Sequence, residues 1–74
     1  MTLLLNDMTS HLAAAGIESP RLEARLLLGA ACGISADEAV LLRRELTAGE
    51  RERLDSMLRE RVRKQKAEAE IFFG

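Results

Sequence analysis

The sequence predicts an all-α fold, a small orthogonal bundle of four main helices followed by a short C-terminal tail or a fifth helix. Leu, Ala, Arg and Glu dominate the composition, and all four are good helix formers. Apolar residues recur three and four positions apart, which is the period of an amphipathic helix. Glycines and capping residues divide the 74 residues into four segments. With 47% hydrophobic residues, the chain carries enough apolar surface to fold as one domain.

The first helix is expected over about residues 3–15. Its apolar positions, which share one face, are Leu4, Leu5, Met8, Leu12 and Ala15. Gly16 follows, and glycine readily adopts the left-handed conformation that ends a helix.

The second helix has the clearest start signal. Ser19 is expected to accept a hydrogen bond from an early helical N–H, and Pro20 suits the first helical position. The helix should run to Cys32, with Gly33 ending it. Its apolar residues spread around most of the cylinder, which predicts a central helix with Leu27 and Leu28 buried.

Two capping boxes mark the remaining helices. Ser35 with Glu38 opens a short third helix over about residues 36–44, and Thr47 with Glu50 opens the fourth. The third helix is expected to give Val40, Leu41 and Leu42 to the core. The fourth is expected to end near Lys66, with an apolar stripe of Leu54, Met57, Leu58 and Val62.

Residues 67–74 form the expected tail, which ends in Ile71, Phe72, Phe73 and Gly74. Exposed aromatic residues at a terminus would be unfavourable. We therefore expect either a short fifth helix folded back onto the bundle or a chain that continues into a longer protein, and the second interpretation is preferred.

The sequence contains no recognisable catalytic constellation. His11 is the only histidine and is expected at the edge of an apolar stripe, while Cys32 is the only cysteine and suits the core. Metal-ligand spacings and a glycine-rich phosphate loop are absent. The chain alone is therefore expected to be no enzyme and to bind no metal or cofactor.

Cysteine content and hydropathy bear on location. A single cysteine excludes an internal disulfide and suits a reducing compartment. No apolar run reaches the roughly 20 residues that a membrane helix needs. We therefore expect a cytoplasmic monomer with no membrane contact.

The formal net charge of −1 hides a basic segment. Residues 59–66 carry five bases and one acid, whereas residues 1–50 carry seven acids and four bases. This segment can be a solvated helix end that favours the negative end of the helix dipole. Alternatively, it contains a partner-binding surface, whose candidate residues are Arg59, Arg63, Lys64 and Lys66.

The segment from Ser19 to Glu23 is a candidate structural motif. One interpretation is a helix cap, Ser19-Pro20, followed by a solvated Arg21. The other is that Arg21 or Glu23 also joins this helix to the fourth one through Arg61, since a paired arginine and carboxylate fix a helix crossing.

The residues from Glu18 to Leu28 resemble the Ser-Pro-Arg-x-Asp/Glu-Ala-x-x-Leu-Leu segment of the HemK/PrmC family. The likeness continues through Cys32-Gly33-Ile34-Ser35 and the Leu46-Thr47 opening. It extends to the Leu-x-x-x-Leu-x-x-Arg pattern of Leu54, Leu58 and Arg61, and covers about residues 3–66. The family's Glu-Pro and tyrosine after the fourth helix are missing from this sequence.

The resemblance implies that residues 1–74 form the N-terminal, substrate-recognition domain of a longer methyltransferase. In that family a downstream Rossmann-like domain binds S-adenosylmethionine and methylates the glutamine of the Gly-Gly-Gln loop of peptide chain release factors. The expected partners are therefore a release factor and the downstream catalytic domain, and no catalytic or cofactor residue carries over to this chain.

Two other functions remain open from the sequence. A free-standing interaction or dimerisation module would need no catalytic domain. A helix-turn-helix DNA binder would use the third and fourth helices, although the overall acidity and the lack of a basic recognition helix count against it, and no nucleic acid is expected.

Overall fold

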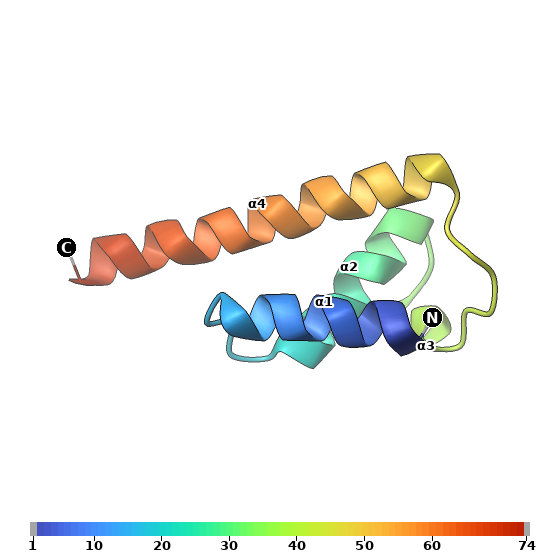
Figure 1. Ribbon diagram of the computed structural model, residues 1–74, viewed down its shortest axis with the longest axis horizontal. Coiled ribbons are helices and arrows are strands. Elements are labelled where there is room, and N and C mark those ends of the chain that lie inside the picture. The colour runs from blue at the N-terminus through green and yellow to red at the C-terminus, as the bar shows by residue number, and fades with distance from the viewer. Residues whose placement is uncertain (1, 74) are drawn as a thin grey trace.

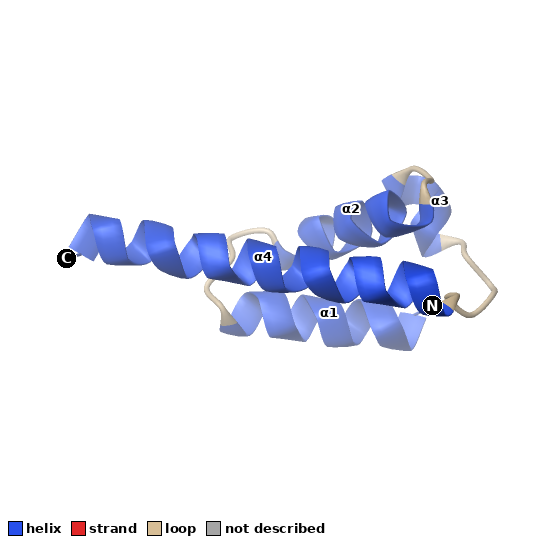
Figure 2. Ribbon diagram, turned by 90° about the horizontal axis from the view of Figure 1, so that it is seen from above, coloured by secondary structure: helices blue, strands red, loops and turns tan. Residues whose placement is uncertain are grey.

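The computed structural model describes the backbone of residues 2–73 and the side chains of residues 4–68. Within residues 2–73 the chain forms four helices and no strand: α1 (Thr2–Ala14), α2 (Pro20–Cys32), α3 (Ala36–Val40) and α4 (Ala48–Phe73). The predicted all-α bundle is confirmed. α1 and α4 run roughly along the long axis of the molecule, and the inclined α2 packs against both, with α3 beside α2 (Figure 1). Seen from above, α4 lies over the seam between α1 and α2 (Figure 2).

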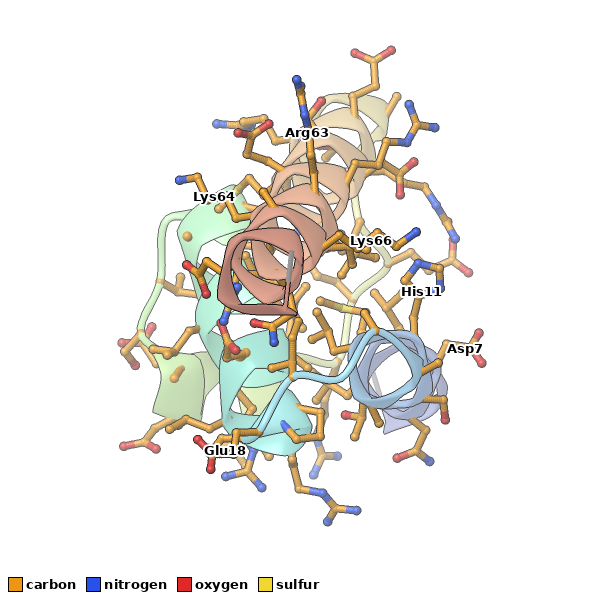
Figure 3. The ribbon with its side chains drawn as sticks, turned by 90° about the vertical axis from the view of Figure 1, so that its left-hand side faces the viewer. Asp7, His11, Glu18, Arg63, Lys64 and Lys66 are labelled. Atoms are coloured by element: carbon orange, nitrogen blue, oxygen red, sulfur yellow. The ribbon has the colours of Figure 1, made fainter. Side chains whose placement is uncertain are left out.

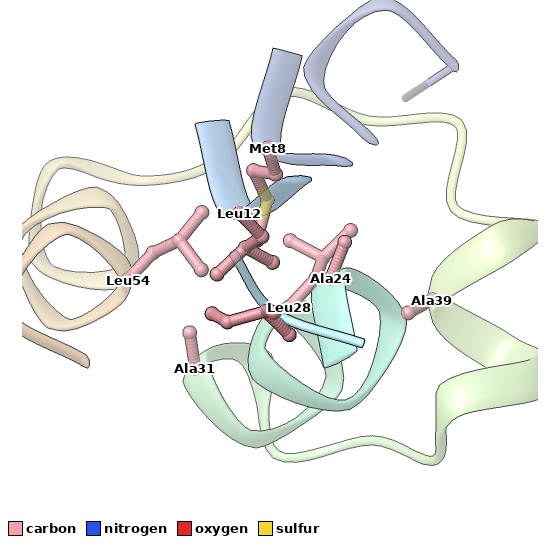
Figure 4. Close-up of a cluster of buried hydrophobic side chains, with 8 residues drawn as sticks. Met8, Leu12, Ala24, Leu28, Ala31, Ala39 and Leu54 are labelled. Atoms are coloured by element: carbon pink, nitrogen blue, oxygen red, sulfur yellow. The ribbon is translucent and has the colours of Figure 1, made fainter. Parts of the chain in front are cut away.

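The central position predicted for α2 is confirmed, because α2 packs against each of the other three helices. Its Leu28 is fully buried together with Leu12 of α1, and Leu54 of α4 closes the same cluster (Figure 4). Leu27 is only partly buried at the edge of this core. The core thus joins α1, α2 and α4 through a few large side chains.

Small residues let the other helices approach α2. Ala24 and Ala31 are fully buried on its inner side, and Gly29 is buried where the chain returns towards α3. A Cβ atom at Gly29 would lie 2.7 Å from the carbonyl oxygen of Ile34, closer than van der Waals contact allows. Glycine at this position therefore permits the close passage of residues 34–35 over α2.

The outer face of α2 departs from the expectation of a helix that is apolar and covered nearly all round. Leu22 and Leu26 are each about half exposed, at 53% and 52%. The reason is geometric: α1 and α4 cover one side of α2, and the five residues of α3 cover only one further strip.

The predicted helix ends at Gly16 and Gly33 are confirmed. Both glycines have a positive φ, of 85° and 72°. Ile17 N–H donates to the carbonyl of Leu12 and Ile34 N–H to that of Gly29, as in the Schellman motif. In the first of these ends, buried Ile17 also adds to the core.

The predicted side-chain cap at Ser19 is wrong. The Ser19 hydroxyl makes no capping hydrogen bond among the described residues, and its backbone has a φ of −122° and a ψ of 66°. Its carbonyl still accepts the N–H of Glu23, at 3.0 Å. The start of α2 at Pro20 is therefore set by the proline and this first backbone bond.

The third helix is shorter than predicted. α3 ends at Val40, so the residues expected in the core lie at its end or in the following turn, and Leu41 is 74% exposed. Buried Ala39 makes the core contact instead. The Ser35 hydroxyl accepts the N–H of Glu38 as predicted. The helix stops early because residues 41–47 must cross to the start of α4.

The fourth helix is longer than predicted. It continues through Lys66 to Phe73, so the expected break and separate tail are wrong, and its last turns extend past the end of α1 (Figure 1). Residues 66–73 contain no Gly, Pro or capping residue, and their Ala and Glu favour a helix. The expectations for the Phe72 and Phe73 side chains lie outside the described residues.

The close approach at Gly29 gives a stability prediction. Gly29→Ala should lower the free energy of unfolding by about 1–3 kcal/mol, because the added methyl group forces the 34–35 backbone to move. Gly49→Ala is the matched control, since nothing lies within 4 Å of a Cβ atom there. That variant should stabilise the chain by about 0.4–1 kcal/mol. Urea unfolding of both variants checks the pair, and equal effects would contradict the close packing of residues 34–35 on α2.

Candidate protein-binding site

The four basic residues predicted as a partner-binding surface lie on two different faces of α4. Arg59, Arg63 and Lys66 are spaced four and three residues apart and all line a hollow beside α1, although the Arg63 side chain points away from α1 and α2 (Figure 3). Lys64 points to the opposite side, whereas Lys66 and His11 of α1 point into the same space (Figure 3). The structure thus separates Lys64 from the other three residues.

A groove lies between α1 and α4, and we call it the α1–α4 groove. One hollow in it, of about 480 Å³, is lined by His11, Arg59, Val62, Arg63, Lys66 and Ala67. A second hollow of about 480 Å³ is lined by Leu4, Asp7, Met8, Ser10, His11, Leu54, Asp55 and Leu58. Because His11 lines both, the two hollows adjoin, and the name α1–α4 groove covers the pair, with a basic end and a more apolar end.

Lys64 belongs to a separate hollow of about 470 Å³ between α2 and α4. Its other lining residues are Leu27, Ser56, Met57, Glu60 and Arg61. This hollow carries both charge signs, whereas the basic end of the α1–α4 groove carries no acid among its lining residues. The basic end of the α1–α4 groove is therefore the stronger candidate for binding an acidic partner.

The structure brings together Glu23 and Arg61 of the candidate structural motif. The Arg61 Nε donates to Glu23 Oε1 at 2.5 Å, and Nη2 donates to Oε2 at 3.0 Å. Each side chain is only about a quarter exposed, and this ion pair raises the pKa of Arg61. The pair joins α2 to α4 and helps to fix the rotation of α4 about its own axis.

The remaining members of that motif do not take part in the α2–α4 connection. Arg21 is exposed and lines a smaller hollow of about 130 Å³, together with Leu5, Asn6, Thr9, Arg25 and Val40. Ser19 is exposed, and Pro20 occupies the first position of α2. Only Glu23 therefore reaches across to α4.

At the start of α4, the half-exposed Arg44 forms an ionic cluster with the buried Glu50. The residue is 8% exposed, and both of its carboxylate oxygens accept from the Arg44 guanidinium at 2.7 Å. The carboxylate also accepts the Thr47 N–H, while the Thr47 hydroxyl accepts the Glu50 N–H, which completes the predicted capping box. Hydrogen bonds from Arg44 and then from Thr47 lower the pKa of Glu50 to about 2.

The sequence indicated the capping box but not the role of Arg44. Arg44 lies in the irregular segment 41–47, where no periodicity relates it to Glu50. A buried carboxylate needs a cation nearby. The only local sequence feature that could have indicated such a cation was the adjacent pair Arg43 and Arg44. The effect of Arg44 is to hold the crossing segment against the start of α4.

Cys32 and His11 are placed unlike the residues of a nucleophilic site. Burial first, and then the Glu50 carboxylate, raise the pKa of the Cys32 thiol, so the reactive thiolate is disfavoured. His11 is exposed on the groove. In the described part of the chain, no group of three His, Cys, Asp or Glu side chains could hold a metal ion.

Among the described helices, none combines the length and apolar character that crossing a bilayer requires. A family model described as the PrmC N-terminal domain matches residues 4–65. No curated protein and no solved structure matches the chain significantly.

The Glu23–Arg61 pair predicts a measurable coupling. A double-mutant cycle with Glu23→Ala and Arg61→Ala should give about 0.5–1 kcal/mol, the upper range for a partly exposed pair, because the geometry is bidentate. A parallel cycle with Glu23→Ala and Arg21→Ala serves as the control. Those two residues are two positions apart on α2 and do not face each other. Equal coupling in the two cycles would contradict the helix-joining role.

The pKa of Glu50 predicts a pH-dependent contribution to stability. Its folded-state pKa of about 2 lies below the ordinary value of 4.5, so ionised Glu50 favours folding above about pH 4.5. This contribution fades as the pH falls towards 2. The melting temperature of Glu50→Gln should therefore lie below that of the unmodified chain near neutral pH, and the gap should narrow in acid.

The control for this experiment is Glu52→Gln. Glu52 is exposed in the same first turns of α4, and its side chain makes no hydrogen bond with the described residues. Its melting temperature should follow that of the unmodified chain. If the difference in melting temperature between Glu50→Gln and the unmodified chain stays constant down to pH 2, the Glu50 carboxylate does not act through its charge.

Proposed function

This chain belongs to the PrmC N-terminal domain family, and on that premise we propose that it recognises a protein substrate for a protein-(glutamine-N5) methyltransferase. The substrate would be a peptide chain release factor in the cytoplasm, modified at the glutamine of its Gly-Gly-Gln loop. A catalytic domain of the same enzyme would bind S-adenosylmethionine and transfer the methyl group. The observation that carries the proposal is the family match over residues 4–65.

The α1–α4 groove supports a binding role. Its apolar residues provide surface that a partner can cover, and Arg59, Arg63 and Lys66 form a charged rim at one end. Apolar surface surrounded by polar residues is characteristic of protein interfaces. A standard interface covers roughly 800 Å² of each partner, so a domain of this size alone would bind weakly.

The mechanism of the proposed function is positioning. A Gly-Gly-Gln loop is short and offers few side chains to recognise. A second contact at a distance would hold the reacting amide close to the methyl donor and reduce the entropy lost in reaching the transition state. The domain itself would contribute no proton transfer and no cofactor contact.

The connection between α3 and α4 favours a protein partner over duplex DNA. A helix-turn-helix motif joins its two helices by a turn of about three or four residues. In this chain the longer segment 41–47 separates α3 from α4, and α3 has only five residues. α4 also carries acids among its bases, as at Glu52, Asp55 and Glu60.

Deletion of the domain tests the proposal. The full-length enzyme without residues 1–66 should lose at least about tenfold in kcat/KM on an intact release factor, a loss of roughly 1.4 kcal/mol in transition-state stabilisation. A short peptide containing Gly-Gly-Gln should be methylated equally by both forms. The peptide result is the control for correct folding of the catalytic domain. An unchanged kcat/KM on the intact factor would reject the recognition role and leave a purely structural appendage or an independent module.

A further inference from the structure

The apolar part of the α1–α4 groove has a regular spacing. Leu54, Leu58 and Val62 repeat every fourth residue along α4, so each turn presents one apolar side chain. Leu4 and Met8 of α1 repeat at the same interval across the groove. Met8 and Leu54 are nearly buried and form the floor, while the other three are partly exposed and form the walls.

The charges in the groove are segregated along its length. His11, Arg59, Arg63 and Lys66 line the end nearest the C-terminal half of α4, and Asp7 and Asp55 line the other end. Among the side chains of residues 4–68, neither Arg59, Arg63 nor Lys66 forms a salt bridge. The basic charge at this end is therefore available to an incoming partner.

The dimensions of the groove suit a short helix. From Leu54 to Lys66 the α4 wall is about 18 Å long, at the usual rise of 1.5 Å per residue, which corresponds to roughly three helical turns. Both walls are helices, and their backbone groups are already hydrogen-bonded, so an extended peptide would find no strand edge to pair with. An amphipathic helix would instead place apolar side chains between those of the walls.

We propose that the α1–α4 groove binds an amphipathic helix of the partner protein whose acidic residues cluster at one end. The acidic end lies against Arg59, Arg63 and Lys66, and apolar residues three and four apart lie over Leu58 and Leu4. This inference rests on the proposed function, because it names the feature of the protein substrate that the domain recognises.

The charge pattern distinguishes this occupant from a nucleic acid. A phosphate backbone carries its charge evenly along its length. The groove is basic at one end only, and the carboxylates of Asp7 and Asp55 would face the phosphates at the other end. A helix with acids at one end only pairs with the basic end of the groove and keeps its carboxylates away from Asp7 and Asp55.

Nuclear magnetic resonance titration of the 74-residue chain tests the groove directly. The probe is a synthetic amphipathic helix of about 18 residues, or five turns, with leucines three and four apart and glutamates at one end; a second peptide has lysine in place of every glutamate. The acidic peptide should shift the amide resonances of His11, Leu58 and Lys66, and the basic peptide should bind at least about tenfold more weakly. Equal binding of the two peptides, or shifts confined to the α2–α4 hollow around Leu27 and Met57, would overturn the proposal.

Two adjacent positions on α4 provide matched variants. Arg63→Glu and Lys64→Glu change the net charge equally, and both residues are exposed, but only Arg63 lines the groove. Arg63→Glu should weaken binding of the acidic peptide about fivefold to tenfold, because an attraction is lost and a repulsion is added. Lys64→Glu should weaken binding of the same peptide by less than about twofold. Equal losses would mean that only net charge matters and would overturn the proposal.

The same two variants, tested with an intact release factor, separate this inference from the proposed function. If the release factor binds, and Arg63→Glu weakens this binding no more than Lys64→Glu does, the groove is not the binding site. The proposed recognition of the substrate would still stand. If the factor does not bind while the acidic peptide still occupies the groove, the groove recognises an acidic helix of another protein and the proposed function fails.

Discussion

Three helices pack against α2, and this shared contact holds the fold together. α2 can accept neighbours on several sides because its contact positions are small: Ala24, Gly29 and Ala31 let backbones approach, and Leu28 fills the space between α1 and α4. A chain this short buries only about 60% of the surface that its unfolded form exposes, so each buried side chain contributes a large share of the stability. Larger residues at these positions would separate the helices and open the core.

Two ionic contacts then orient α4 on this core. Glu50 is fixed by Arg44 and Thr47 at the start of α4, and the pair of Glu23 and Arg61 fixes its middle. With its rotation set in this way, α4 presents Leu54 inwards and places Arg59, Arg63 and Lys66 along the groove beside α1. The groove and its basic end thus follow from how the helix is held, which links the packing of the core to the proposed recognition of a protein partner.

The sequence predicts most of the helix ends that depend on local signals, the side-chain cap at Ser19 being the exception. The glycines after α1 and α2 and the Thr47 capping box act within a few residues, and the structure contains all of them. The early end of α3 and the contribution of Arg44 depend on the path of residues 41–47 towards α4. No local sequence pattern predicts that path. The basic segment 59–66 was visible in the sequence. Its division into two faces follows from the helical period, but which of these faces lies beside α1 depends on the tertiary contacts of α4.

Native-state hydrogen exchange measures most directly whether α2 is the element on which the bundle depends. We expect the amide protons of Leu28 and Ala31 to exchange only through global unfolding, with the highest opening free energies in the chain. Amides in α3 and beyond Lys66 in α4 should exchange through local opening at lower free energies. If α2 exchanged more readily than α1 and the first half of α4, those two helices would form the stable core without it, and the central role of α2 would be contradicted.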